Sequence, residues 1–250
     1  MIDVALTAAG VRPAGVAVVI DVLRATTTIA QALAGGYERV LCTASRERAL
    51  EMRGPGRVLA GEEACVPPPG FDLGNSPAGV ETASGRELVL ATSNGTPAIV
   101  AAAAEADLTL LGCLANLDAL LGVLGDRAEA GAGAGDEDED EDEDEDILLV
   151  CSGTNGRLAL EDVYVAGRIV AGLGGRRSDS AAMCALVGAA APSALDLFRE
   201  STNGRLLVEV GLESDIVWCA RESTLELVPR VSSVTGDLAV IAAADALRPG

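Results

Sequence analysis

The chain has 250 residues, of which 49% are hydrophobic and 2% aromatic, and its formal net charge is −20. A chain of this length forms one large domain or two small ones. It contains no His and no Lys, since all 18 basic residues are Arg. These absences exclude Ser-His-Asp and Cys-His catalysis, His-ligated zinc, Schiff-base chemistry and the P-loop lysine. Carboxylates, hydroxyls, thiols, Arg and metal ions held by oxygen remain as candidates.

Negative charge is concentrated in one tract. Residues 136–146 are an unbroken run of eleven of the 38 acidic residues, which leaves 27 against 18 Arg in the rest of the chain. Such a surface disfavours nucleic acids and anionic membranes as partners. Residues 126–146 cannot bury enough apolar surface to fold, so we predict a disordered acidic insertion at the surface. Calcium buffering and partner binding are the alternatives for the tract.

No segment is expected to enter a membrane or to direct export. Apolar runs such as Pro97–Ala104 fall short of the roughly 18–20 residues that a membrane span needs, and no basic region followed by an apolar run is seen at the N-terminus. We therefore expect a cytoplasmic protein. The six Cys include no C-x-x-C pair, which disfavours zinc and redox dithiols, so we expect mostly small buried thiols.

Short apolar runs alternate with helical patterns along the chain. The expected strands are 16–20, 39–42, 57–60, 87–91, 108–111 and 147–150. The expected helices are 25–34, 44–52, 96–104, 116–124, about 158–171, 180–189 and 193–198, with short strands and a C-terminal helix after Leu225. This alternation predicts an α/β fold with a largely parallel sheet. We expect one unit over residues 1–250, with two lobes, about 1–125 and 147–250, as the alternative.

Polar segments that follow three of the predicted strands are the first candidate site. They begin at Asp21, Thr92 and Cys151, and each also opens a helix. The carboxyl ends of parallel strands form the ligand crevice of an open α/β sheet, and helix N-termini favour anions. Three such turns on one edge predict a phosphate-binding rim, although each alone is also an ordinary turn and helix cap. Asp21 itself is either a metal ligand or the partner of Arg24 in a structural bond.

Three further features are open to two interpretations each. Residues 61–79 form a Pro- and Gly-rich loop whose length indicates a functional role. The alternative is that its Asp72 and Asn75 form an Asx turn. Cys151 at a helix start is a candidate low-pKa nucleophile, although no C-x₅-R spacing follows it. The segments 93–95, 154–156 and 202–204 share an Asn-Gly pair, which marks either a structural repeat or a common turn dipeptide.

The polar segments match one family in order and spacing. They are Val18–Ile29 (VVIDVLRATTTI), Gly70–Pro77 (GFDLGNSP), Thr92–Thr96 (TSNGT) and Cys151–Asp162 (CSGTNGRLALED), followed by Ser201, Gly204, Leu207, Gly211, Asp215-Ile216, Cys219 and Val228-Pro229. Over nearly its whole length, apart from the acidic insertion, the chain resembles the 2-phosphosulfolactate phosphatases. The resemblance implies the family's own layered α/β fold with a mixed, largely parallel sheet.

The resemblance also implies a Mg²⁺-dependent phosphomonoesterase that hydrolyses (2R)-2-phospho-3-sulfolactate to (R)-3-sulfolactate and phosphate, a step towards coenzyme M in methanogens. Its partner would be a small phosphorylated organic acid, with a homodimer as one assembly to consider. On this basis we expect catalytic roles for Asp21, Arg24, Asp72 and Asn94. Mg²⁺ ligands are expected among Asp21, Glu62, Asp72, Glu161 and Asp162. Substrate binding is expected from Thr26, Asn75, Ser76, Gly95, Thr96, Ser152, Gly153 and Asn155.

Three positions depart from the family's pattern. Glu63, Pro97 and Asn203 stand where the family commonly has Arg, a basic residue and His, respectively. A phosphatase of another 2-phospho-2-hydroxy acid and a non-catalytic protein that binds phosphorylated acids are therefore kept as alternatives. Attack on phosphorus by water and attack by an Asp carboxylate also both stay open.

Overall fold

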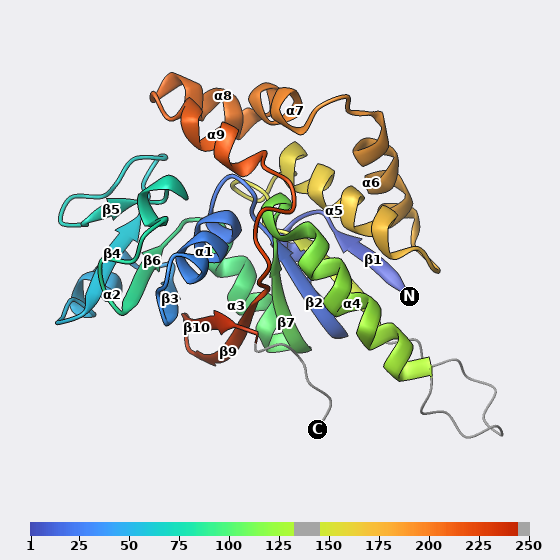
Figure 1. Cartoon of the computed structure of the whole chain (residues 1–250), viewed down its shortest axis with the longest axis horizontal. Helices are drawn as coiled ribbons and strands as arrows, with labels where there is room; N and C mark the ends of the chain where they lie inside the picture. The colour runs from blue at the N-terminus through green and yellow to red at the C-terminus, as the bar shows by residue number, and fades with distance from the viewer. Residues whose placement is uncertain (133–145, 245–250) are drawn as a thin grey trace.

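A ten-stranded sheet runs through the computed structural model, which describes residues 1–132 and 146–244 (Figure 1). In order across the sheet, the strands are β1 (Ile2–Ala5), β8 (Ile147–Cys151), β2 (Ala14–Ile20), β7 (Ala106–Gly112), β9 (Pro229–Thr235), β10 (Leu238–Ala243), β3 (Arg39–Thr43), β6 (Glu87–Ala91), β4 (Arg57–Gly61) and β5 (Leu73–Gly74). Helices cover this mixed, largely parallel sheet, so the predicted layered α/β class is confirmed.

The sheet consists of two parallel groups of strands. β1, β8, β2 and β7 form one group, and β3, β6, β4 and β5 form the other. The hairpin β9–β10 joins them through antiparallel pairs with β7 and β3. The two groups therefore run in opposite directions along the ladder. Because twist accumulates from strand to strand, segments that follow strands of both groups can still meet in one place.

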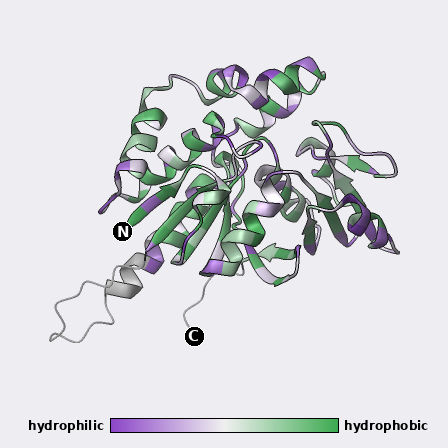
Figure 2. Cartoon of the chain, turned by 180° about the vertical axis from the view of Figure 1, so that it is seen from behind, coloured by the Kyte–Doolittle hydropathy of each residue, from purple (hydrophilic) through white to green (hydrophobic). Residues whose placement is uncertain are grey.

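The helices are α1 (Ala25–Ala34), α2 (Arg46–Glu51), α3 (Gly95–Glu105), α4 (Leu117–Ala132), α5 (Leu160–Leu173), α6 (Asp179–Ala190), α7 (Ala194–Glu200), α8 (Thr202–Glu209) and α9 (Glu213–Cys219). Side chains of β2 alternate between two cores, as the period of a strand requires. Val18 and Ile20 face the core shared with α4, α5 and α6, whereas Ala17 and Val19 face the core shared with α1 and α3. Figure 2 shows the hydrophobic residues concentrated in the central strands.

Helices α7, α8 and α9 form a cap beside α5, at the top of Figure 1. Phe198 of α7 is fully buried and meets Tyr164 of α5 edge-on, with ring centroids 5.8 Å apart. Such an aromatic pair adds to the area that it buries. The cap is therefore anchored to the main core, and α8 reaches the ends of the strands.

Most predicted elements are present, and the differences concern short or late elements. The sequence pattern did not predict β1, β5, α8 or α9. Where a C-terminal helix is expected, Leu238–Ala243 is strand β10, and residues 245–250 lie outside the described part. The division into lobes 1–125 and 147–250 does not follow the sheet, because β8 lies between β1 and β2.

The prediction of a disordered segment over 126–146 is wrong for its first residues. Helix α4 continues to Ala132, because the Ala and Glu residues after Asp126 have high helix propensity. Asp146 is also placed, with its carboxylate 3.0 Å from the N-terminal amine of Met1. The rest of the acidic tract lies outside the described residues. Among the described helices, none alone has the length and apolarity to cross a membrane, whereas α6 and α7, bent by 109° at their junction, meet those two requirements as a pair.

Candidate active site

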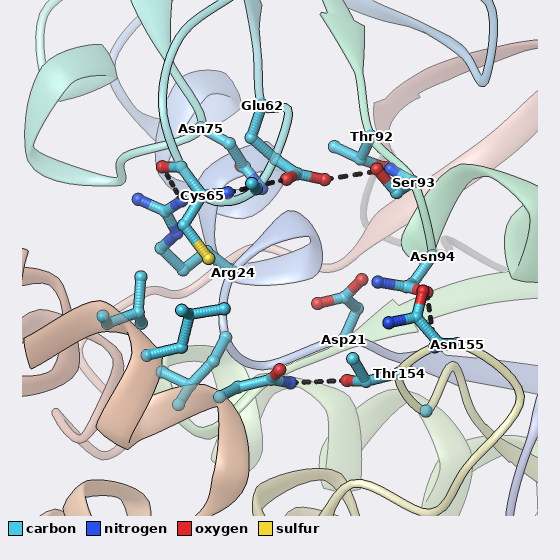
Figure 3. A pocket seen from close by; sticks show the side chains of 16 residues that line it. Asp21, Arg24, Glu62, Cys65, Asn75, Thr92, Ser93, Asn94, Thr154 and Asn155 are labelled. Atoms are coloured by element: carbon cyan, nitrogen blue, oxygen red, sulfur yellow. Dashed lines mark hydrogen bonds between the residues drawn. The ribbon is translucent and has the colours of Figure 1, made fainter. Parts of the chain in front are cut away.

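A pocket lies where segments following β2, β4, β6 and β8 meet helix α8 (Figure 3). It is lined by Asp21, Leu23, Arg24, Glu62, Ala64, Cys65, Asn75, Thr92, Ser93, Asn94, Gly153, Thr154, Asn155, Asn203, Leu206 and Leu207. Figure 3 shows Asp21 near the middle, with Arg24 and Cys65 on one side and Asn94 and Asn155 on the other. The three predicted polar turns do converge. They do so from both parallel groups, not from one edge of a parallel sheet.

Asp21 follows β2 directly and is 8% exposed. One carboxylate oxygen, Oδ1, accepts a hydrogen bond from the N–H of Ala25 at the start of α1, over 3.3 Å. Burial raises the pKa of Asp21 to about 6; the bond from Ala25 opposes the rise, and the charges of Glu62 and Glu161 add to it. Asp21 is thus a carboxylate surrounded by other negative charge, an environment that favours a cation beside it.

Glu62 follows β4 directly, and both of its carboxylate oxygens accept hydrogen bonds from the backbone. Its Oε2 accepts from the N–H of Cys65 at 3.1 Å, and its Oε1 accepts from the N–H of Ser93 at 3.0 Å. Ala64 and Cys65 between these contacts have φ values of 49° and 69°, a region that costs non-glycine residues energy. The Glu62 carboxylate therefore holds a strained turn against the segment after β6.

Glu161 and Asp162 are buried behind the pocket, at 1% and 2% exposure. Burial raises the pKa of Glu161, and burial with the charges of Asp21 and Glu161 raises the pKa of Asp162 well above its usual range. Asp162 accepts hydrogen bonds from the N–H groups of Val22 and Gly153 and from the Ser152 hydroxyl. It ties together the turns after β2 and β8. Glu161 has a carboxylate oxygen that is still available: its Oε2 has no hydrogen-bond partner among the described residues.

The three Asn-Gly segments meet at the pocket. The side-chain oxygen of Asn94 accepts from the N–H of Asn155 at 3.0 Å. The side-chain amide of Asn203 donates to Thr154 Oγ1 and to Glu161 Oε1, both at 2.6 Å. The segments differ in conformation, since Asn94 precedes α3, Asn155 has a φ of 51° in a turn and Asn203 lies within α8. The structural-repeat interpretation is therefore wrong, and the recurrence instead marks residues that gather at one site.

Arg24 pairs with Asp215, not with Asp21. Its Nη1 lies 2.6 Å from Asp215 Oδ2, and its Nη2 donates to the Cys65 carbonyl at 2.8 Å. The proposed structural bond between Asp21 and Arg24 is therefore replaced by a bond to α9. Asp21 is left free to face the pocket.

All the predicted site residues except Asp72 fall into two groups. Asp21, Arg24, Glu62, Asn75, Asn94, Gly153 and Asn155 line the pocket. Thr26, Ser76, Gly95, Thr96, Ser152, Glu161 and Asp162 lie behind it and hold those residues in place. Thr26, for example, bonds the backbone of Asp21, and Thr96 bonds Thr92. Asp72 belongs to neither group.

Asp72 is placed by the structure outside the pocket. Its carboxylate accepts from the N–H of Leu59 at 2.9 Å and pairs with Arg53 at 3.0 Å, and its side chain is 41% exposed. The bond to Leu59 and the pair with Arg53 lower the pKa of Asp72 against the effect of burial. This carboxylate fastens the segment before β5 to β4, so the structure places Asp72 away from the pocket in which catalytic and metal roles were expected, and the alternative Asx turn with Asn75 is not formed.

The cysteines are mostly small buried thiols, as predicted. Five are buried, while Cys65 is half-buried and lines the pocket. Cys151 is not a nucleophile of low pKa, because burial and the nearby charges of Asp162 and Glu161 raise its pKa well above the usual range. The thiol of Cys151 belongs to the core shared with α5.

Sequence reasoning missed residues that reach the pocket from the cap and from loops. Thr154, Leu206, Leu207 and Cys65 line it, and Asp215 supports it. Helix α8 is short, and its sequence gives no sign of which strand ends it covers. The repeated Asn-Gly pair was the one signal that could have found Thr154 and Asn203 together.

The pocket residues fit a Mg²⁺ ion in their chemistry. Mg²⁺ prefers oxygen ligands, binds through one or two carboxylates and keeps several waters or substrate oxygens. Asp21 and Glu62 supply carboxylates, and the buried oxygens Asn75 Oδ1 and Glu161 Oε2 lack a partner among the described residues. In the described part of the chain, no three His, Cys, Asp or Glu side chains lie together as a metal site.

The chain is similar to proteins of one family. The family model described as 2-phosphosulpholactate phosphatase matches residues 4–233. A protein of Deinococcus radiodurans named probable 2-phosphosulfolactate phosphatase is 40% identical over 233 residues, which cover 89% of each chain. A similarly named protein of Thermus thermophilus is 35% identical over 228 residues, covering 89% of this chain and 90% of the relative. The protein of Methanothermobacter thermautotrophicus named 2-phosphosulfolactate phosphatase is 34% identical over 215 residues and covers 86% of each chain.

Proposed function

The chain belongs to the 2-phosphosulfolactate phosphatase family of phosphoric monoester hydrolases, and from this premise we propose that it hydrolyses (2R)-2-phospho-3-sulfolactate to (R)-3-sulfolactate and phosphate with Mg²⁺. Family membership confirms the resemblance noted in the sequence and makes the chain an enzyme, so the non-catalytic alternative is set aside. The observation that carries the proposal is the Asp21 carboxylate, which lies in a pocket bordered by the turns that open α1 and α3 and by the turn after β8.

The phosphoryl group would bind beside Asp21. Helices α1 and α3 begin at Ala25 and Gly95, close to this carboxylate. The N–H groups of Ala25, Thr26 and Thr96 already bond Asp21 and Thr92, so the contribution of these two helix starts would be the positive end of each helix dipole, which suits a phosphoryl oxygen. Arg24 adds a guanidinium that can hold two oxygens of one anion. These donors would stabilise the charge on the transferring group.

Asp21 is our first choice to hold Mg²⁺, and the charges of Glu62 and Glu161 both act on it. The bound ion would polarise the phosphoryl group and neutralise its charge. Asp162 is less suited to direct ligation because it already accepts three hydrogen bonds. Its role would be to keep the turn after β2 and the turn after β8 at a fixed spacing. The cation would also offset the mutual repulsion of the buried carboxylates.

Hydrolysis breaks the bond between phosphorus and the C2 oxygen, adds the oxygen of water to phosphorus and returns one proton to the leaving oxygen. Asp21 would serve in one of two ways, as the base that accepts the proton of water or as the nucleophile that attacks phosphorus. Rapid quenching with ³²P-labelled substrate separates these routes. Label that stays on the protein through an acid quench and is released by alkali or hydroxylamine would identify the nucleophilic route, and label in free phosphate alone would identify attack by water.

A second substrate class is favoured by one observation. Of the three departures from the family's pattern, Glu63 and Pro97 are exposed outside the pocket, and Glu63 lies 3.8 Å from Arg46. Asn203 does line the pocket. A neutral amide there would hold a second anionic group less strongly than a protonated His. Another 2-phospho-2-hydroxy acid, with a carboxylate and no sulfonate, is therefore the alternative substrate.

The deciding experiment measures phosphate release by the purified chain from 2-phosphosulfolactate, 2-phospholactate, 2-phosphoglycolate and p-nitrophenyl phosphate. Each substrate is tested with Mg²⁺ and with EDTA. Highest kcat/KM on 2-phosphosulfolactate, lost in EDTA and restored by Mg²⁺, supports the proposal. A higher kcat/KM on 2-phospholactate would establish the alternative substrate. Full activity in EDTA would overturn the proposed metal.

A further inference from the structure

Arg24 and Asp215 are one of the most deeply buried ion pairs in the described part of the chain. The side chains are 3% and 2% exposed, and the Asp215 Oδ2 atom lies 2.6 Å from Arg24 Nη1. The second oxygen of Asp215, Oδ1, accepts from the Ser76 hydroxyl, also at 2.6 Å. Three segments far apart in sequence, the turn after β2, the loop after β5 and helix α9, therefore meet at one carboxylate.

We propose that Asp215 is a positioning residue: it fixes the Arg24 guanidinium for the phosphoryl group and, itself held by Ser76, keeps Arg24 from pairing with Asp21. The proposal rests on the proposed function in one respect, the binding of a phosphoryl group by Arg24. Asp215 is not among the residues that line the pocket, so it acts through Arg24 and not on the substrate.

The hydrogen-bond pattern of Arg24 supports this role. A guanidinium has five N–H donors in a rigid plane, and the structure commits Nη1 to Asp215 and Nη2 to the Cys65 carbonyl. Two bonds at different amino groups fix both the position and the tilt of the plane. The donors that remain can serve an anion without further ordering of the side chain. Preorganisation of this kind is a major source of transition-state stabilisation.

The charges around Arg24 explain why a buried acid is needed. Asp21 and Glu62 line the same pocket as Arg24. A desolvated guanidinium is strongly attracted to a carboxylate within a few ångströms, so an unrestrained Arg24 would turn towards one of them. An ion pair between Arg24 and Asp21 would cover the carboxylate that the reaction needs. Asp215 supplies a competing partner from outside the pocket, and Ser76 holds that partner in place.

The test is a double-mutant cycle on orthophosphate binding. Orthophosphate is the product of any phosphatase, so its dissociation constant, measured calorimetrically with Mg²⁺, does not depend on the organic substrate. Asp215→Asn should weaken orthophosphate binding about tenfold or more, and Arg24→Met should weaken it at least as much. In the Arg24→Met background, Asp215→Asn should cause no further loss, because its effect passes through Arg24.

A matched control is Asp3, a carboxylate on β1 outside the pocket that accepts hydrogen bonds from Arg12, Ser178 and Ser180. Asp3→Asn should lower the melting temperature and leave orthophosphate binding unchanged. Since removal of one partner of a buried pair can prevent folding, Ser76→Ala provides a milder version. It should weaken binding by a smaller factor, and this loss should also vanish in Arg24→Met.

Two results would overturn the positioning role: unchanged orthophosphate binding in folded Asp215→Asn, or an equal loss with and without Arg24. Failure of the proposed substrate looks different. A wild-type chain that binds orthophosphate but does not hydrolyse 2-phosphosulfolactate contradicts the substrate, while the same cycle still decides the role of Asp215.

Discussion

Gly95 lies so close to Asp21 that no side chain fits between them. A Cβ atom added at Gly95 would come within 2.6 Å of Asp21 Oδ2 and within 2.6 Å of the Ala25 Cβ. The start of α3 therefore touches both the carboxylate in the middle of the pocket and the first turn of α1. This contact makes the position of the Asp21 carboxylate depend on the backbone of another helix.

Gly95→Ala is expected to reduce kcat/KM by about 100-fold, because displacing a reacting group by about 1 Å has that effect. The measurement is steady-state phosphate release, with a circular dichroism spectrum to establish that the variant is folded. A folded Gly95→Ala enzyme with wild-type kinetics would contradict the assignment of Asp21.

The matched control for Gly95→Ala is Gly122→Ala in α4. A Cβ at Gly122 would meet nothing within 4 Å. Because Ala has a higher helix propensity than Gly, the substitution should raise stability by about 0.5–1 kcal/mol and leave the kinetics unchanged. Thermal unfolding and phosphate release on the same preparations compare the two positions.

Asp21→Asn should lower kcat by about 100-fold or more while the protein stays folded, because the amide keeps the shape of the side chain and removes the charge that would hold Mg²⁺. The amide oxygen can still accept the hydrogen bond from Ala25. The variant should therefore need a higher Mg²⁺ concentration for half-maximal activity. Near-normal turnover in folded Asp21→Asn would refute the central role of this residue.

Asp72→Asn tests the correction that the structure makes to the sequence-based site. The Asp72 carboxylate pairs with Arg53 at the surface, and surface ion pairs contribute about 0–1 kcal/mol. The substitution should change kcat/KM less than about twofold and lower the melting temperature slightly. A loss of activity as large as that of Asp21→Asn would return Asp72 to the active site.

The loss of folding stability at low pH should depend on Asp3. Burial alone would raise the pKa of Asp3, but hydrogen bonds from Ser178, Ser180, Arg12 and the Val4 N–H hold it well below its ordinary value of 3.8. A carboxyl whose pKa is lower in the folded state stabilises the fold above its unfolded pKa, and the contribution is lost as the pH falls. Wild type should thus be more stable than Asp3→Asn at pH 7. The two melting temperatures should approach each other below about pH 4, as a series of thermal melts would show.

The sequence predicted the order of strands and helices well because buried β-branched runs and helix-opening polar turns are local signals. Asp21, Asn94, Gly153 and Asn155 lie in the turns that follow such runs, and the family resemblance predicted them as site residues. Their convergence was expected from one edge of a parallel sheet. The structure achieves it differently, through two parallel groups that run in opposite directions and are joined by β9–β10.

Long-range partners could not be predicted in this way. Asp72 and Asp215 both lie in segments that match the family, but nothing local shows which of the two carboxylates reaches the site. One forms a surface pair with Arg53, and the other meets Arg24 from a helix 191 positions later in the chain. Helices α8 and α9 are short, so their periodicity is a weak signal, and their placement depends on packing against α7 and against each other. Contacts of this kind are set by the tertiary fold.

The position of β9 and β10 in the sheet has a consequence for how the chain is made. Among the described strands these two come last in the chain, yet they lie in the middle of the sheet, between β7 and β3. While the ribosome is still adding the residues before Pro229, β7 and β3 both present open edges that can pair with other chains. The nascent protein is therefore prone to aggregate until this hairpin emerges, because β9 and β10 pair with the open edges of β7 and β3 and join the two parallel groups.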